Sequence, residues 1–226
     1  MQDIWNSITL GIVEGLTEFL PVSSTAHLLV AEKALMLDDN RWHAFTVVIQ
    51  LGAILSVVAV YWSKFWQVLV GLPREREAQM FTAGVLVAFF PAVIAGLAFG
   101  KIINTVLLNP TLALPVIATT WIVGGILMLV LERIAPRPRY LDGDRLPLMK
   151  CFQVGLCQLA ALLPGVSRSG ATILGGELLG IERKAISHFT FYLAVPTMFG
   201  ASAYELYKEW RTLTSADTML IAIGFV

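Results

Sequence analysis

Residues 14–27 read EGLTEFLPVSSTAH, and the interpretation of the whole chain starts from this stretch. An apolar helical run carries Glu14 and Glu18, is interrupted at Pro21, and resumes with hydroxyl residues that end at His27. A carboxylate at membrane depth is costly unless it is paired, hydrated or bound to a cation. Non-helical backbone inside lipid is tolerated only where protein buries it or where it lines a wet cavity. The stretch therefore predicts a broken helix with a function inside a membrane.

Composition places the chain among integral membrane proteins. Of its 226 residues, 57% are hydrophobic and 14% are charged, and the mean hydropathy is +0.74. One soluble core of this size needs far less apolar side chain. The 16 basic residues balance the 16 acidic ones, so no net field favours nucleic acid, and any phosphate must be recognised locally.

The first segment, residues 2–37, is predicted to be a re-entrant hairpin. Apolar residues recur with helical period before Pro21, which ends that helix. Ser23 or Ser24 is a suitable N-cap for a second helix that runs to the exposed turn LDDNR. Each half is shorter than the roughly 20 residues that a bilayer requires. A hairpin that enters and leaves on one side therefore fits better than two full spans.

Three longer apolar stretches follow this hairpin. They lie near residues 43–62, 80–100 and 111–131. Each is long enough to cross a bilayer, and residues 63–79 are predicted to connect the first two. Pro91 and Pro115 are expected to kink their helices without ending them. With the hairpin, these crossings make a first repeat over about residues 1–133, after which comes a loop rich in proline and charge.

The pattern then begins again in a second repeat, over about residues 148–226. Residues 150–181 predict a second re-entrant hairpin, interrupted by LPGVSRSGATI, and a crossing near residues 186–206 follows. The last apolar run, residues 218–226, would cover only about half of a 30 Å hydrocarbon core. We therefore expect the second half to be truncated relative to the first.

Matching breaks relate the two halves. Leu163–Pro164 occupies the place in the second hairpin that Leu20–Pro21 occupies in the first. Short polar breaks in corresponding places of two halves are the best sequence indication of a site between inverted repeats. Three crossings separate the hairpins, and an odd number inverts the second half. The predicted fold is one all-α integral membrane domain, residues 1–226, with an inverted-topology repeat.

The basic residues indicate which side each loop faces. The first side would hold Lys33, Arg41, Lys101, Lys208 and Arg211. The second side would hold twice as many: Lys64, Arg74, Arg76, Arg133, Arg137, Arg139, Arg145, Lys150, Arg183 and Lys184. By the positive-inside rule the second side is cytoplasmic, so the first hairpin enters from outside. Only Arg168 then lies within the membrane.

The paired carboxylates of the first break are the first candidates for chemistry. Glu14 and Glu18 share a helical face, and at about 6 Å and an effective dielectric near 20 they repel by roughly 3 kcal/mol. Either one of them is protonated, or a divalent cation lies between them with phosphate oxygens as its other ligands. The alternative is a hydrated pair at a helix end.

Ser24 and His27 follow, three residues apart at a helix start. This spacing would let the imidazole exchange a proton with the hydroxyl, and the free N–H groups of the helix start would point at an anion. The alternatives are N-capping for Ser23 or Ser24 and a satisfied buried histidine for His27.

The second break supplies a strong base, Arg168. Its hydroxyl neighbours are Ser167, Ser169 and Thr172. A guanidinium fork with hydroxyl and backbone donors suits phosphate oxygens. The alternative is an ion pair with Glu14 or Glu18 that holds the hairpins together, and the two arrangements are compatible at different stages.

These breaks resemble the two signature motifs of the BacA/UppP family of undecaprenyl-pyrophosphate phosphatases. The similar stretches are EGLTEFLPVSSTAH and PGVSRSGATI, with VVIQLGAIL and FYLAVPTMFGA. The resemblance implies an enzyme of the bacterial inner membrane that removes the terminal phosphate of undecaprenyl pyrophosphate and regenerates the lipid carrier of cell-wall synthesis. It also implies an influence on bacitracin resistance, a site open to the periplasm, and use of Mg²⁺ or Ca²⁺.

The resemblance further implies roles for single residues. Ser24 is the favoured nucleophile, His27 is the acid/base, and Glu14 and Glu18 are catalytic or metal-linked acids. The pyrophosphate would be bound by Arg168, Ser167, Ser169, Thr172, Ser23 and Thr25. Attack by Ser24 would give a phosphoserine, and the mechanistic alternative is direct attack by water.

The remaining alternatives concern class and partners. A transporter or flippase for polyprenyl phosphate or another anion is the alternative to an enzyme, because inverted repeats with broken helices are also transporter architecture. The expected partners are undecaprenyl pyrophosphate and membrane lipids, without nucleic acid, and a homodimer is left open beside a monomer.

Overall fold

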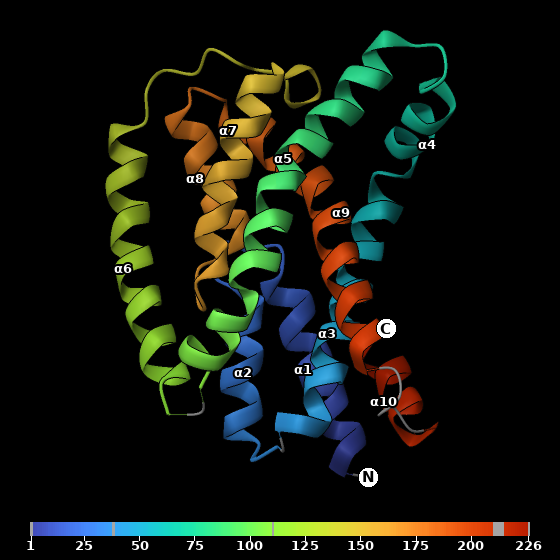
Figure 1. The fold of residues 1–226 in the computed structure, drawn as a ribbon, viewed down its shortest axis with the longest axis vertical. Helices are drawn as coiled ribbons and strands as arrows, with labels where there is room; N and C mark the ends of the chain where they lie inside the picture. The colour runs from blue at the N-terminus through green and yellow to red at the C-terminus, as the bar shows by residue number, and fades with distance from the viewer. Residues whose placement is uncertain (1, 38, 110, 210–214, 226) are drawn as a thin grey trace.

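The computed structural model describes residues 2–37, 39–109, 111–209 and 215–225 (Figure 1). Every named element in these ranges is helical. The α-helices are α1 Gln2–Thr17, α2 Ser24–Ala34, α3 Asp39–Val60, α4 Trp62–Gly71, α5 Arg76–Ile102, α6 Ala113–Ile134, α7 Leu148–Gln158, α8 Arg168–Leu178, α9 Arg183–Glu209 and α10 Ser215–Phe225. The shorter helices are η1 Ile103–Leu107, η2 Gly143–Arg145 and η3 Leu159–Leu162.

Two helical hairpins enter the bundle from opposite ends and meet near its middle (Figure 1). The first hairpin, α1 and α2, comes from the lower end of that view. The second, α7, η3 and α8, comes from the upper end. They occupy the residues for which hairpins are predicted, 2–37 and 150–181. That both hairpins re-enter a membrane stays a prediction.

Two of the described helices, α5 and α6, are long and apolar enough to cross a membrane unaided. A third candidate span is broken, because residues 45–60 of α3 and helix α4 meet at an angle of 74°. The predicted crossing near residues 186–206 forms the continuous helix α9, which is less apolar. Two of its polar side chains are satisfied by protein, since Thr190 and Ser202 are buried and hydrogen-bonded to other helices.

One local prediction is wrong, the kink at Pro115, and one helix was not anticipated. The first half of the predicted connection at residues 63–79 is helical and belongs to α4, which presents Trp62 and Trp66 as exposed rings stacked 6.0 Å apart. Pro115 lies in the first turn of α6, where a missing N–H removes no helical hydrogen bond, so it does not interrupt a helix body. Pro91 lies inside α5, which continues past it as predicted.

The most extensive helix contacts join the two halves of the chain. α5 packs on α7, and α3 packs on α9. A buried apolar cluster between α5, α7 and α9 includes Ala88, Val154, Ile186, Phe189 and Leu193. α6 differs, since among the described helices it packs extensively only against α8. The bundle therefore has a firm centre and one loosely attached outer helix.

Gly155 permits the close contact between α5 and α7. A Cβ atom at this position would lie 2.4 Å from the backbone oxygen of Ala88. Gly155→Ala is therefore expected to lower the thermal unfolding midpoint in detergent by several degrees, because overpacking costs roughly 1–3 kcal/mol. Gly100→Ala in α5 is the matched control, since a Cβ there meets nothing within 4 Å. Equal midpoints for the two variants would contradict this packing.

The loops predicted to be cytoplasmic lie together at the upper end of the bundle (Figure 1). Several of their charges are paired, in the ion pairs Lys64–Asp144 at 2.5 Å, Arg145–Glu77 at 2.9 Å, and Arg183–Glu132. Lys33 and Lys101 lie near the ends of α2 and α5, at the lower end. The side chains of Arg41, Lys208 and Arg211 fall outside the described part of the chain. Which end is cytoplasmic stays a prediction.

Candidate active site

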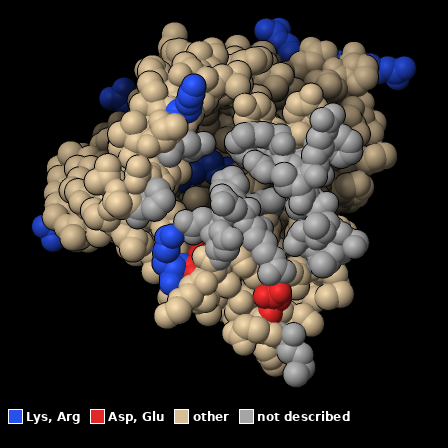
Figure 2. Space-filling view, turned by 60° about the horizontal axis from the view of Figure 1, so that its bottom comes forward, with Lys and Arg blue, Asp and Glu red and all other residues tan. Residues whose placement is uncertain are grey.

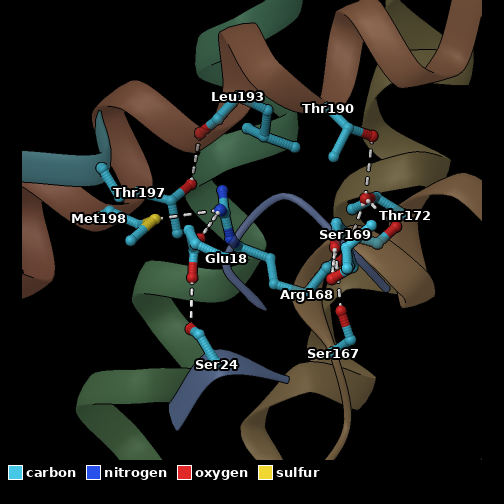
Figure 3. Close-up of polar contacts among 12 residues, drawn as sticks. Glu18, Ser24, Ser167, Arg168, Ser169, Thr172, Thr190, Leu193, Thr197 and Met198 are labelled. Carbon is cyan, nitrogen blue, oxygen red and sulfur yellow. Dashed lines mark hydrogen bonds and ion pairs between the residues drawn. The ribbon is translucent and has the colours of Figure 1, made fainter. Parts of the chain in front are cut away.

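One carboxylate joins the tips of the two hairpins (Figure 3). The Ser24 hydroxyl donates to Glu18 Oε2 at 2.5 Å, within the first hairpin. Arg168 Nη2, from the second hairpin, donates to Glu18 Oε1 at 2.6 Å. The ion pair that the sequence offered as an alternative is thus confirmed. It places a hydroxyl, an acid and a guanidinium in one cluster.

Arg168 keeps a hydrogen-bonding capacity that its protein neighbours do not use. Its side chain is only 17% exposed and that of Glu18 only 9%. The Nη1 atom is buried and has no partner within the described ranges, and the second contact of Nη2, at 3.0 Å, is the weak acceptor Met198 Sδ. A buried, unpaired donor is costly. An anionic ligand beside Glu18 would satisfy it.

Glu14 is the second buried acid of the cluster. It is 2% exposed, and neither carboxylate oxygen has a hydrogen-bond partner among the residues that the structure describes. It lies near enough to Glu18 and Arg168 for their charges to act on it, and it is close to Ser24. A buried carboxylate in this condition takes up a proton or a cation. A bound proton and a bound divalent cation, both predicted for the glutamate pair, fit the surroundings of Glu14.

A cation here would have few protein ligands. The described part of the chain holds no group of three or more histidine, cysteine or acidic residues that could bind a metal. Glu14 and Glu18 are the acids that face this position. Mg²⁺ is commonly held by one or two carboxylates, with water and substrate phosphate completing its shell. The donor set therefore fits a cation that arrives with the substrate rather than one in a closed protein site.

The backbone at the first tip explains where the Ser24 hydroxyl points. Ser23, which precedes α2, has φ 67° and ψ 92°, a conformation that residues other than glycine rarely adopt. Ser23 occupies the N-cap position, as predicted for Ser23 or Ser24, but its side chain makes no capping bond. The hydroxyl of Ser24, the first residue of α2, is bonded to Glu18 instead. The helix start is thus left without a side-chain cap.

The predicted pairing of Ser24 with His27 is not made. His27 Nδ1 lies 2.9 Å from the backbone oxygen of Ser23, and the ring packs 4.7 Å from that of Trp121 on α6. A carbonyl only accepts hydrogen bonds, so Nδ1 carries the proton and Nε2 is left to exchange one. The role of His27 as an acid/base stays a prediction, but its partner is not the Ser24 hydroxyl.

Two serines hold the second tip together. Ser167 caps α8, because its Oγ accepts from the backbone N–H of Gly170 at 3.1 Å. The hydroxyls of Ser167 and Ser169 are 2.9 Å apart. Ser169 also donates to the backbone oxygen of Leu20 at 3.2 Å, which makes a second link between the hairpins. These contacts position the tip, and direct binding of phosphate by the two serines stays a prediction.

Thr172 anchors the helix that carries Arg168. It is fully buried, its Oγ1 donates to the backbone oxygen of Arg168 at 2.9 Å, and it accepts from Thr190 of α9 at 2.9 Å (Figure 3). Its contacts support the arginine more directly than they support a ligand. Thr25, by contrast, is exposed on α2, whereas Ser23 is buried.

Sequence reasoning missed four residues of this neighbourhood. They are Thr190, Met198, Trp121 and Thr120, whose hydroxyl donates to the backbone oxygen of Pro164 at 2.7 Å. The repeat alignment gave one signal, because Phe189–Thr190 matches Phe45–Thr46. Met198 lies within FYLAVPTMFGA, one of the stretches that resemble the family, whereas Thr120 and Trp121 lie in an apolar helix with nothing to distinguish them from lipid-facing residues.

The lower end of the bundle offers an approach to this cluster. Figure 2 turns that end forward and shows a hollow with a basic side chain visible inside it.

Comparisons with known proteins give a consistent result. The family described as BacA, bacitracin resistance protein BacA, matches residues 7–226. A protein of Rhodopseudomonas palustris strain TIE-1, named undecaprenyl-diphosphatase, is 46% identical over 225 residues, covering 99% of this chain and 82% of that protein. Proteins with the same name from Caulobacter sp. strain K31 and Bradyrhizobium diazoefficiens are 48% and 46% identical, and each aligns with 100% of this chain and 84% of its own length.

Proposed function

Since this chain belongs to the BacA family and is an undecaprenyl-diphosphatase, we propose that the two hairpin tips form its active site. The reaction removes the terminal phosphate of undecaprenyl pyrophosphate and returns undecaprenyl phosphate as a lipid carrier. The observation that carries the proposal is the bridge from Ser24 through Glu18 to Arg168. It puts a nucleophile, a proton acceptor and an anion binder at one point.

Ser24 is the nucleophile in this proposal. Its oxygen attacks the terminal phosphorus in line with the bridging oxygen, and its proton passes to Glu18, to which it is already bonded at 2.5 Å. The bond from phosphorus to the bridging oxygen breaks, undecaprenyl phosphate leaves, and a phosphoserine remains. Water then attacks the phosphoserine, releases inorganic phosphate and restores the hydroxyl.

Arg168 binds the phosphate and spreads its developing charge. The buried Nη1 atom is ready to donate to a phosphate oxygen without first breaking a protein contact. A guanidinium in a water-poor site stabilises the equatorial oxygens of a phosphoryl transition state strongly. As the phosphate takes over Nη2, the carboxylate of Glu18 is freed to accept the proton of Ser24. Arg168 thus binds the Glu18 carboxylate first and the substrate phosphate afterwards.

His27 serves the leaving group. One proton stays on Nδ1, bonded to the Ser23 carbonyl. In the imidazolium form Nε2 gives a second proton to the bridging oxygen as undecaprenyl phosphate leaves, and the neutral Nε2 then takes a proton from the attacking water. This role requires no contact with Ser24, which agrees with the observed partners of both side chains.

A divalent cation, Mg²⁺ or Ca²⁺, is part of the proposal. It would be held by Glu14 and Glu18, and it supplies further neutralisation of phosphate charge when bound. The fit rests on the two unpartnered, buried oxygens of Glu14.

Glu14→Gln is accordingly expected to raise the half-saturating concentration of the divalent cation by roughly tenfold or more, as loss of a ligand charge does. The measurement is phosphate release after treatment with a chelator, titrated with Mg²⁺ and then Ca²⁺. Glu77→Gln, at an exposed carboxylate of α5, is the control and should leave the titration unchanged. Identical curves for the two variants would remove Glu14 from the cation site.

The proposal places the enzyme in the bacterial inner membrane as an inverted-topology repeat. The arrival of the hairpins from opposite ends supports the inversion, and the basic loops gathered at one end support a cytoplasmic position for that end. The lower end would then face the periplasm, where the pyrophosphate headgroup enters.

Release of inorganic phosphate from undecaprenyl pyrophosphate by the purified protein in detergent tests the function directly. A diphosphatase converts the substrate to the monophosphate with equal release of phosphate. A transporter for the same lipid would bind it and leave it intact, so persistent binding without hydrolysis would contradict the proposal.

A further inference from the structure

An apolar cavity of about 670 Å³ lies beside the contact of the two hairpins. Its inner end is lined by residues of both tips, Pro21, His27 and Ser167. From there it extends between α6 and the second hairpin as far as Leu131 and Leu178. The span along α6 from residue 119 to residue 131 is about 18 Å at 1.5 Å per residue. The cavity is therefore elongated, and it begins at the proposed active site.

The outer wall of the cavity is the loosely attached helix α6. The contacts that tie this helix to the hairpin tips include the hydrogen bond from Thr120 to the Pro164 carbonyl at 2.7 Å and the ring contact of Trp121 with His27. Beyond them, α6 packs mainly on α8, and its long apolar stretch is almost wholly exposed. A lipid chain can therefore reach the cavity sideways, past α6, without unpacking the centre of the bundle.

We propose that this cavity holds the first prenyl units of the lipid substrate, with the chain directed from the hairpin tips toward the end that carries the basic loops. The inference deepens the proposed function and rests on it. A pyrophosphate bound by Arg168 lies near mid-depth of the bundle, so its chain must start there and needs an apolar path. The cavity begins beside that point, at Pro21, His27 and Ser167, and its mostly apolar walls offer water few hydrogen-bond partners.

Gly124 gives a clean way to close the cavity. It lines the wall on α6, and a Cβ built there meets nothing within 4 Å, so a larger side chain enters the empty space without displacing protein. Gly96 of α5 is the matched control, because it too is a helical glycine with nothing within 4 Å and it is not part of the cavity lining. Neither residue belongs to the proposed catalytic cluster.

The test compares Gly124→Leu with Gly96→Leu on three substrates: undecaprenyl pyrophosphate, fifteen-carbon farnesyl pyrophosphate and five-carbon dimethylallyl pyrophosphate. For Gly124→Leu we expect KM to rise roughly tenfold or more for the two longer chains, because each excluded methylene weakens binding. The kcat/KM for the five-carbon substrate should stay at the parental value. Gly96→Leu should match the parent on all three.

Failure of this inference can be told apart from failure of the proposed function. A parental protein that releases no phosphate from any substrate would end the proposed function. If the parental protein is active and Gly124→Leu has the same KM values as Gly96→Leu, only the cavity proposal is overturned. The cavity would then be filled by bulk lipid and not by the substrate chain.

A second measurement covers the case in which Gly124→Leu does not fold. A farnesyl pyrophosphate analogue with a benzophenone at the far end of its chain should label peptides of α6 and α8 in the parental protein. Labelling confined to α3 or α9 would contradict the proposed path.

Discussion

Arg168→Ala is expected to lower phosphate release from undecaprenyl pyrophosphate by roughly 10³-fold, which is the usual scale for an arginine that stabilises a phosphoryl transition state. The substitution removes the guanidinium whose free donor faces the cluster and leaves Glu18 with Ser24 as its remaining partner. The measurement is phosphate release under single-turnover conditions, which reports chemistry rather than product release.

Two control variants separate catalysis from folding. Arg183→Ala removes an exposed arginine from its pairs with Glu132 and Glu177 and should keep near-parental turnover. Arg168→Lys keeps the charge without the planar fork and should lie between the parent and Arg168→Ala.

Stability should follow a different pattern. Breaking a buried pair by removing one partner costs about 3–5 kcal/mol, so Arg168→Ala should also lower the unfolding midpoint. The double variant with Glu18→Gln and Arg168→Gln removes both charges and should regain much of that loss while remaining inactive. A folded Arg168→Ala that turns over within a few-fold of the parent would remove Arg168 from its proposed role.

The second large effect is expected for Ser24→Ala. It removes the attacking oxygen, so release of phosphate should fall by roughly 10³-fold or more, as loss of a nucleophile does in other enzymes. Thr9→Ala is the control, because Thr9 is an exposed hydroxyl residue of α1 whose side chain donates only to its own helix, at the Trp5 carbonyl. That control should keep most of the parental activity.

A labelled intermediate distinguishes the two mechanisms at Ser24. Acid quenching of the parental enzyme with substrate labelled in the terminal phosphate should trap phosphoserine, and the label should be found on Ser24. A Ser24→Ala variant that retains about a tenth of the parental rate, together with no trapped label, would show that water attacks directly.

The two hairpins could be predicted because prolines and polar residues interrupt otherwise apolar helices. Pro21 and Pro164 stand at the observed breaks, and the neighbouring acids and base have no place in lipid. α4 was missed because a short amphipathic helix next to a long apolar one has the composition of a loop with aromatic residues. No proline or glycine near residue 61 predicts the bend of 74° there.

The hydrogen-bond partners of the site residues were harder to predict than which residues belong to the site. A spacing of three residues suggested a Ser24–His27 pair, which assumes that the helix start is regular. The positive φ of Ser23 accompanies a different pairing, in which Ser24 bonds to Glu18 and His27 to the Ser23 carbonyl. The sequence left open whether Arg168 forms an ion pair with a glutamate or stays free to bind phosphate. Both alternatives depend on how far each hairpin extends into the bundle.

The arrival of the hairpins from opposite ends has a mechanical consequence. In the proposed membrane orientation each tip is held at its depth by the interface from which its hairpin starts, and the contacts between the tips include those of Glu18 with Arg168 and of Ser169 with the Leu20 carbonyl. A thicker bilayer, with longer acyl chains, would draw those interfaces apart and stretch the contacts at the tips. The turnover rate in reconstituted vesicles should therefore depend on acyl-chain length. The activity of the enzyme would then report the thickness of the surrounding bilayer.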